Sequence, residues 1–230
     1  MSSRPLRVYL VGAHSTGKTT LSRWIRDAYG LPMLSEVART VLAELEMDLD
    51  SLRANLDAVD RYQSEVFHRQ VSLERSVGGG FVSDRAFCNL AYAAQHSTIL
   101  ARLVRGPEFE SYMRWVSGGL VFFVRPHREL VCADGVRAGL DYEEIMAIDG
   151  MVKLLLEMHA IPYVPIASLS MQERVRTIRA LVDSRLRELQ AVERADALAR
   201  GRRVGGLDIP SAEEIERRAA GPNGLGAGGL

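Results

Sequence analysis

The chain has 230 residues, of which 47% are hydrophobic and 25% are charged, and its formal net charge is zero. This composition is that of an ordinary globular protein with one sizeable core, which excludes a largely disordered chain. The charge balance gives no sign of a polyanionic partner for the whole molecule, although it leaves room for a local basic groove. We find no signal segment and no long apolar run, and the two cysteines lack metal-ligand or redox-motif spacing. We therefore expect a cytoplasmic protein with reduced thiols and no membrane partner.

The predicted elements alternate between short strands and helices. Strands are expected at residues 6–11, 31–35, 81–84, 120–124 and 161–166. Helices are expected at residues 18–29, 36–45, 51–77, 87–95, 107–116, 142–159 and 171–200. This alternation predicts an α/β fold, with a five-stranded parallel sheet and helices on both faces.

The domain boundaries follow from composition. We expect one domain over residues 1–200, with a polar, basic and glycine-containing loop at about residues 125–140 that acts as a lid. Residues 201–230 form a C-terminal extension. Its last ten residues include five glycines and can bury little surface, which predicts a flexible tail.

Residues 12–19 read Gly-Ala-His-Ser-Thr-Gly-Lys-Thr and match the P-loop motif in full, between a predicted strand and a predicted helix. The glycines let backbone N–H groups converge on an anion at a helix N-terminus. Lys18 would reach the β- and γ-phosphates, and the Thr19 hydroxyl would bind Mg²⁺. The predicted cofactors are therefore ATP and Mg²⁺. The expected nucleotide-binding residues are Gly12, Ser15, Thr16, Gly17, Lys18, Thr19 and Thr20.

Polar residues follow the second predicted strand, at the edge where ligands bind in open α/β sheets. Glu36 would accept the proton of an attacking hydroxyl or hold a substrate hydroxyl in line, and Arg39 would bind a polar or anionic part of the substrate. The alternative is a helix-surface pair at i, i+3 spacing.

The third predicted strand ends in Asp84, as a Walker B strand does, and Arg85 follows it. Asp84 would hold Mg²⁺, the substrate hydroxyl or both, and Arg85 would bind a phosphoryl or substrate group. A helix cap is the alternative role for an aspartate in this place.

Arginines also gather in and beside the predicted lid. Arg137 would close over the γ-phosphate and stabilise the transferring charge, and Arg125 and Arg128 would bind substrate. The alternative is a solvated basic loop.

With Glu36-x-x-Arg39, Asp84-Arg85 and Asp134-Gly135-Val136-Arg137 in order after the P-loop, the chain resembles the P-loop kinase-like family. This family includes the nicotinamide riboside kinase domain and many phage-encoded AAA-like ATP-binding proteins. The likeness spans roughly residues 6–190. It implies the fold of a nucleoside or nucleotide kinase with a short arginine-bearing lid, and phosphoryl transfer rather than a motor.

The acceptor is the open part of this prediction. Some phage members of the family resemble kinases of 5-hydroxymethyluracil in DNA, so the preferred acceptor is that hydroxymethyl group in phage DNA. The alternatives are a free nucleoside, a nucleotide or nicotinamide riboside. A protein of another class, an ATP-binding regulatory or switch NTPase, would also need the P-loop. In the kinase, Lys18 and the lid arginines would stabilise charge, and Asp84 or Glu36 would act as base. The sequence assigns no oligomeric state.

Overall fold

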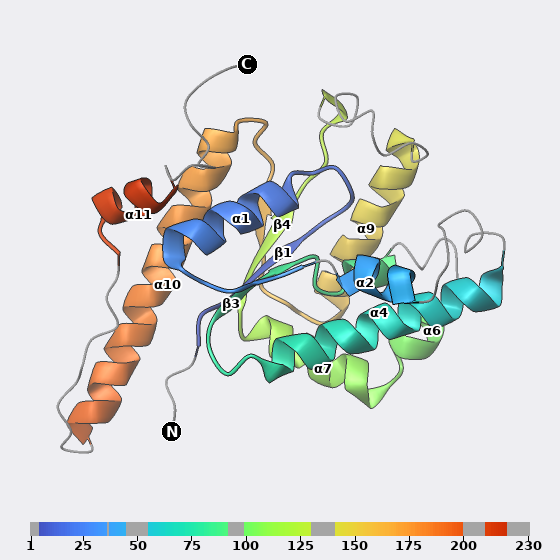
Figure 1. The fold of residues 1–230 in the computed structure, drawn as a ribbon, viewed down its shortest axis with the longest axis horizontal. Helices are drawn as coiled ribbons and strands as arrows, with labels where there is room; N and C mark the ends of the chain where they lie inside the picture. Colours follow the sequence, from blue (N-terminus) through green and yellow to red (C-terminus); the bar gives the residue numbers. More distant parts are fainter. Residues whose placement is uncertain are drawn as a thin grey trace.

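The computed structural model describes residues 5–35, 37–44, 55–91, 99–129, 141–199 and 210–219. Within these residues, five parallel strands form one sheet in the order β2-β3-β1-β4-β5 (Figure 1). The strands are β1 (Arg7–Val11), β2 (Met33–Leu34), β3 (Phe81–Asp84), β4 (Leu120–Val124) and β5 (Val164–Ile166). This sheet confirms the predicted α/β class, with a central strand that leads into the glycine-rich loop.

The register of the central strands brings their carboxyl ends together. Leu10 of β1 pairs with Asp84 of β3 on one side and with Phe122 of β4 on the other. Asp84, the last residue of β3, therefore lies beside the end of β1, where the glycine-rich loop begins. Parallel strands buried on both faces read as nearly continuous apolar runs, and β1 and β4 have this character.

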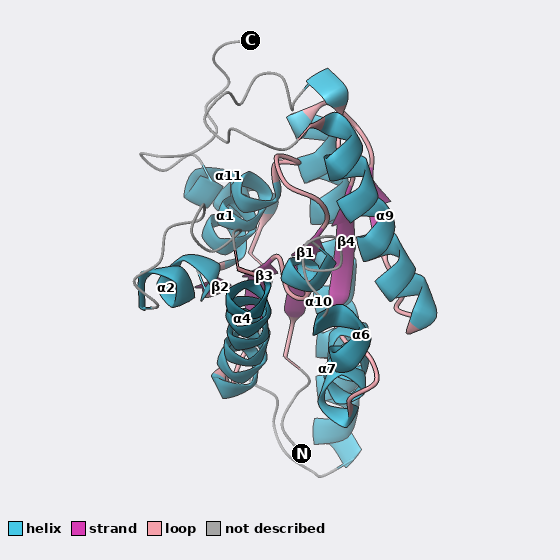
Figure 2. Cartoon of the chain, turned by 90° about the vertical axis from the view of Figure 1, so that its right-hand side faces the viewer, coloured by secondary structure: helices cyan, strands magenta, loops and turns pink. Residues whose placement is uncertain are grey.

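Helices cover both faces of the sheet, as predicted (Figures 1 and 2). Alternate side chains of β1, including Val8 and Leu10, pack with α1, α10 and α11 on one face. The other alternates, Tyr9 and Val11, pack with α4, α7 and α9 on the opposite face. The elements named here are α1 (Lys18–Tyr29), α4 (Leu56–Ser76), α7 (Pro107–Ser117), α9 (Tyr142–Met158), α10 (Met171–Ala199) and α11 (Ala212–Ala219). In the described residues, none of the helices is long and apolar enough for a membrane span.

The helix ends follow local sequence signals. Gly30 ends α1 in the left-handed conformation, at a φ of 66°, and its N–H donates to the carbonyl of Arg26. Asn55 caps α4, and its side chain accepts a 3.1 Å hydrogen bond from the N–H of Ala58. The predicted helix at residues 51–77 thus begins at Leu56 in the structure, and residues 51–54 lie outside the described part.

Among the helices whose bounds the described residues give, α6 (Ile99–Leu103) and α11 were not predicted from the sequence. The helix α6 follows residues 92–98, which lie outside the described part. The helix α11 lies within the predicted C-terminal extension and packs against α1 through the buried side chain of Ile215. Part of the predicted C-terminal extension is therefore a helix that packs against α1, in the helical layer on one face of the sheet. The predicted glycine-rich tail lies outside the described residues.

A short helix and a polar cluster complete the layer that contains α4. The helix α2 (Val37–Glu44) packs on α4 through Val41.

Further along α4, the carboxylate of Glu74 has no exposed surface and accepts hydrogen bonds from Ser83 (2.7 Å), Gln70 (2.9 Å) and Tyr112 (3.1 Å). Burial raises the pKa of the Glu74 carboxyl above its ordinary value. This cluster joins β3, α4 and α7 beneath the carboxyl end of the sheet.

Candidate functional site

The glycine-rich loop between β1 and α1 has the backbone conformation of an anion-binding nest. Gly12, Ser15 and Gly17 all have positive φ angles, of 143°, 55° and 87°. A Cβ at Gly12 would lie 2.3 Å from the carbonyl oxygen of Val124, so the close approach of β4 requires glycine there. Gly17 caps α1 without a side-chain hydrogen bond, which leaves the first N–H groups of the helix available to a ligand.

Lys18 is folded against its own loop. Its ammonium group donates to the carbonyl of Ala13 and, at 3.1 Å, to the hydroxyl of Thr16. The Thr16 hydroxyl in turn donates to the Ala13 carbonyl at 3.2 Å. The structure thus holds the charge of Lys18 within the nest, where a polyphosphate would replace its contacts with the Ala13 carbonyl and the Thr16 hydroxyl.

Thr19 and Asp84 meet at the edge of this nest. The Thr19 hydroxyl donates a 2.6 Å hydrogen bond to Oδ2 of Asp84, and Asp84 is buried. The second oxygen of Asp84, Oδ1, is buried without a hydrogen-bond partner among the described residues. Mg²⁺ takes hard oxygen ligands and usually keeps waters and substrate phosphates as its remaining ligands. The Thr19 hydroxyl and the Asp84 carboxylate, one of whose oxygens has no partner among the described residues, fit such an ion.

The turn after β3 is strained at two residues. Arg85 and Ala86 have φ angles of 101° and 49°, in the left-handed region that side chains disfavour. The turn is held because the Arg85 N–H donates to the carbonyl of Leu10 at 3.0 Å. It places Cys88 under the loop, where the thiol accepts a 3.2 Å hydrogen bond from the N–H of Gly12. Burial raises the pKa of the Cys88 thiol. Cys88 therefore supports the loop as a protonated side chain.

An ion pair between a half-buried arginine and a buried aspartate adds a carboxylate that was not identified from the sequence. Asp149 of α9 is 1% exposed and lies 2.8 Å from the guanidinium of Arg125, just after β4. Burial raises the pKa of the Asp149 carboxyl to about 6, and the positive charges of Arg125, Lys18 and Lys153 oppose that rise. A Cβ at Gly12 would meet the carbonyl of Val124, the residue before Arg125, so the ion pair lies close to the nest. In the sequence, Asp149 follows Ile148 and lies one helical turn before Val152, on the buried face of the helix. This position was the signal that could have indicated a buried carboxylate.

The remaining predicted site residues lie near the P-loop and Asp84 or outside the part of the chain that the structure describes. Arg125 contacts Asp149, and Arg128 is exposed, with its guanidinium 5.0 Å from the ring centroid of Tyr142. The backbone of Arg39 lies in α2, but its side chain is not described. Glu36 and Arg137 lie outside the described residues, as does most of the predicted lid. The structure therefore brings the P-loop residues and Asp84 together, and the roles of all the predicted site residues stay predictions.

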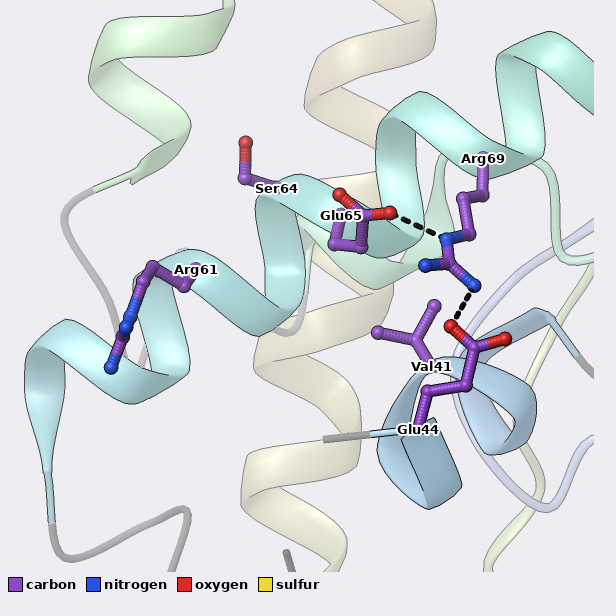
Figure 3. Close-up of a pocket in the computed structure, with 6 residues that line it drawn as sticks. All are labelled: Val41, Glu44, Arg61, Ser64, Glu65 and Arg69. Carbon is purple, nitrogen blue, oxygen red and sulfur yellow. Dashed lines mark hydrogen bonds and ion pairs between the residues drawn. The ribbon is translucent and has the colours of Figure 1, made fainter. Parts of the chain in front are cut away.

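A shallow cavity lies between α2 and α4, with a volume of about 380 Å³. Figure 3 shows Arg69 of α4 reaching between Glu65 and Glu44, with which it forms ion pairs. The lining residues are Val41, Glu44, Arg61, Ser64, Glu65 and Arg69. None of them belongs to the glycine-rich loop, so this cavity is separate from the nest.

The sheet order and the loop geometry define a P-loop NTPase fold of the type that kinases share. The family follows from the sequence: the model of the AAA domain family matches residues 7–174, so the chain belongs to this family. No curated protein matches the sequence.

Solved structures share the fold at low sequence identity. Deoxyadenosine kinase from M. mycoides, with the products dCMP and a flexible dCDP bound, has a TM-score of 0.55 at 11% identity, over 78% of this chain and 99% of that one. The same enzyme with bound dCTP has a TM-score of 0.55 at 12% identity, over 78% and 100%. NadR in complex with NR has a TM-score of 0.55 at 18% identity, over 89% of this chain and 54% of that one. The chain therefore spans about half the length of NadR.

Proposed function

We propose that the protein is an ATP-dependent kinase that transfers the γ-phosphate to a hydroxyl of a nucleoside-type acceptor. The observation that carries this proposal is the Thr19–Asp84 hydrogen bond beside the nest. It brings together two oxygen groups that would hold Mg²⁺, beside the loop that would bind the polyphosphate. A glycine-rich turn without this function would need neither a buried carboxylate nor a buried lysine at that point.

In this proposal, different residues bind the phosphates of ATP, hold Mg²⁺ and add positive charge. Backbone N–H groups of the loop would bind the phosphates, and Lys18 would exchange its contact with Ala13 for phosphate oxygens. Thr19 and Asp84 would hold Mg²⁺, which neutralises phosphate charge when bound. Arg125, which Asp149 holds beside the nest, would add positive charge.

The chemical step is an in-line displacement at the γ-phosphorus. The acceptor oxygen forms a bond to phosphorus as the bond from phosphorus to the β-phosphate bridging oxygen breaks, and ADP leaves. The hydroxyl proton passes to a carboxylate, for which Asp84 and the sequence-predicted Glu36 are the candidates. Arg137 would close over the transferring group, and Arg39 and Arg85 would bind the acceptor.

Two observations favour a free nucleoside-type acceptor over one in DNA. The solved structures with this fold include a deoxyadenosine kinase and NadR in complex with NR. In addition, Arg69 of α4 and Arg114 of α7 form ion pairs with neighbouring glutamates, which offsets the basic charge that a DNA-binding face on these helices would need. Phosphorylation of 5-hydroxymethyluracil in phage DNA stays a prediction from the family resemblance.

A transfer screen with γ-³²P-labelled ATP tests the function. The acceptors are deoxynucleosides, nucleosides, nucleoside monophosphates, nicotinamide riboside and DNA that carries 5-hydroxymethyluracil. We expect label on a free nucleoside-type compound and ADP formation at least about tenfold faster with that acceptor than without it. Label on the DNA instead would reverse the order of the acceptors.

Variants separate the kinase from an ATP-binding switch. Asp84→Ala and Glu36→Ala should each abolish label transfer while ATP binding is retained, whereas Lys18→Ala should weaken ATP binding itself. If ADP release is slow with every acceptor and none accelerates it, the kinase proposal fails, and a partner-regulated NTPase becomes the better description.

A further inference from the structure

Arg174, in the first turn of α10, connects that helix to the P-loop. Its side chain is 1% exposed, and its Nη1 donates a 2.6 Å hydrogen bond to the carbonyl of Thr16. Its Nε donates to the carbonyl of Ser168, in the segment that leads from β5 into α10. The same guanidinium thus holds two backbone segments that are far apart in the sequence.

The charge of Arg174 is unusually costly to bury. Among the ion pairs of the described residues, none involves Arg174, and its Nη2 is buried without a hydrogen-bond partner there. Burial accordingly lowers the pKa of this guanidinium. Buried charges in proteins are normally paired. An apolar side chain would tie α10 to the sheet without this cost, so the guanidinium calls for a further explanation.

The contact with Thr16 fixes the orientation of one peptide group. In a planar trans peptide, the carbonyl of Thr16 and the N–H of Gly17 point in opposite directions. When Arg174 holds the carbonyl on its own side, the N–H of Gly17 is turned to the other side of the loop. Gly17 also has a φ of 87°, and a Cβ there would lie 3.3 Å from Nη1 of Arg174, so the contact suits glycine.

We propose that Arg174 is a positioning residue of the nucleotide site. It orients the Thr16–Gly17 peptide so that the Gly17 N–H binds the β-phosphate, and its unpaired positive charge favours the polyphosphate. This inference rests on the proposed function, because it assigns a residue of α10 to the same ATP site. It also makes the affinity of the nest depend on the docking of the helix that follows β5.

Isothermal titration of the full chain with ADP and with AMP tests this role. Arg174→Ala should raise the Kd for ADP about tenfold or more and leave the Kd for AMP within about twofold, because AMP lacks the β-phosphate. Arg174→Lys keeps the charge but lacks the planar guanidinium whose separate nitrogens reach the Ser168 and Thr16 carbonyls, so its Kd for ADP should lie between those of the wild type and Arg174→Ala. Arg185→Ala, which removes a surface ion pair of the same helix, is the matched control and should bind ADP as the wild type does.

The outcomes separate this inference from the proposed function. A wild-type chain that does not bind ADP would overturn both. A wild-type chain that binds ADP, with variants that bind it equally well, would overturn the role of Arg174 alone. Thermal unfolding of each variant is measured alongside, because a purely structural role lowers Tm but leaves the Kd for ADP unchanged. If Arg174→Ala does not fold, Arg174→Lys decides by the same comparison.

Discussion

The hydrogen bond of 2.6 Å from the Thr19 hydroxyl to Asp84 joins the P-loop to the end of β3. The register explains why these short side chains can meet: β1 and β3 are neighbours in the sheet, and Leu10 pairs with Asp84. The carboxylate therefore lies next to the loop that follows β1, although 65 residues separate Thr19 from Asp84 along the chain.

Asp84→Asn tests the role of this carboxylate. The amide keeps the shape of the side chain but removes the negative charge that would hold Mg²⁺. We expect kcat for phosphoryl transfer to fall on the order of 100-fold, and the Mg²⁺ concentration for half-maximal rate to rise. The measurement is a Mg²⁺ titration of the labelled transfer, with the exposed Asp57→Asn as control. An unchanged Mg²⁺ requirement would remove Asp84 from the metal site.

Gly12→Ala tests the close approach of the loop to β4. A Cβ would lie 2.3 Å from the carbonyl oxygen of Val124, and the φ of 143° disfavours any side chain. We expect the free energy of unfolding to fall by about 2 kcal/mol or more. Gly150→Ala is the matched comparison, because this glycine lies within α9 and an added Cβ meets nothing within 4 Å. That variant should gain about 0.5–1 kcal/mol.

Urea unfolding of both glycine variants measures these changes. Equal effects of the two substitutions would show that the Val124 contact relaxes easily. The pair also separates the general effect of losing a glycine from the steric requirement of the P-loop.

The meeting of the P-loop and Asp84 at one edge of the sheet could be predicted from the sequence because its signals are local. The P-loop is a contiguous motif, and Asp84 is the last residue of an apolar strand, so a parallel sheet brings both to one edge. The alternation of short strands with helices along the chain likewise predicted the parallel sheet and the helices on both of its faces. These features need no knowledge of which distant side chains meet.

The contacts of Asp149 and Arg174 could not be predicted in this way. Each is a charged residue within a helix, and nothing nearby in the sequence indicates the backbone carbonyl or guanidinium that it contacts. Those partners are set by how α9 and α10 pack on the sheet. The short helix α11 was missed for the same reason, since burial of Ile215 against α1 stabilises it.

Glu74→Leu tests the buried polar cluster. The leucine would leave Gln70, Ser83 and Tyr112 without their shared acceptor, so we expect the free energy of unfolding to fall by about 2–4 kcal/mol. Glu74→Gln keeps an acceptor oxygen and should lose less. Urea unfolding measures both, with the exposed Glu110→Ala as control. A leucine variant as stable as the wild type would mean that apolar packing replaces the whole cluster.

The last prediction concerns the pH dependence that Asp149 gives to stability. Its carboxyl has a pKa raised from 3.8 to about 6 in the folded chain, mainly by burial. The protonated form is therefore favoured by folding, and its contribution is fully present below about pH 3.8 and is lost as the pH rises to about 6. Relative to Asp149→Asn, the wild type should lose about 3 kcal/mol of unfolding free energy over that range and then level off.

Urea unfolding of the wild type and Asp149→Asn at intervals between about pH 3 and about pH 7 gives this difference directly, because all other titrations are shared. Arg125→Gln sharpens the test. The positive charge of Arg125 lowers the pKa of Asp149, so its removal should move the loss of stability to higher pH. Parallel stability curves for the wild type and Asp149→Asn would show that the carboxyl titrates alike in the folded and unfolded chains, and that burial between α9 and β4 does not hold its proton.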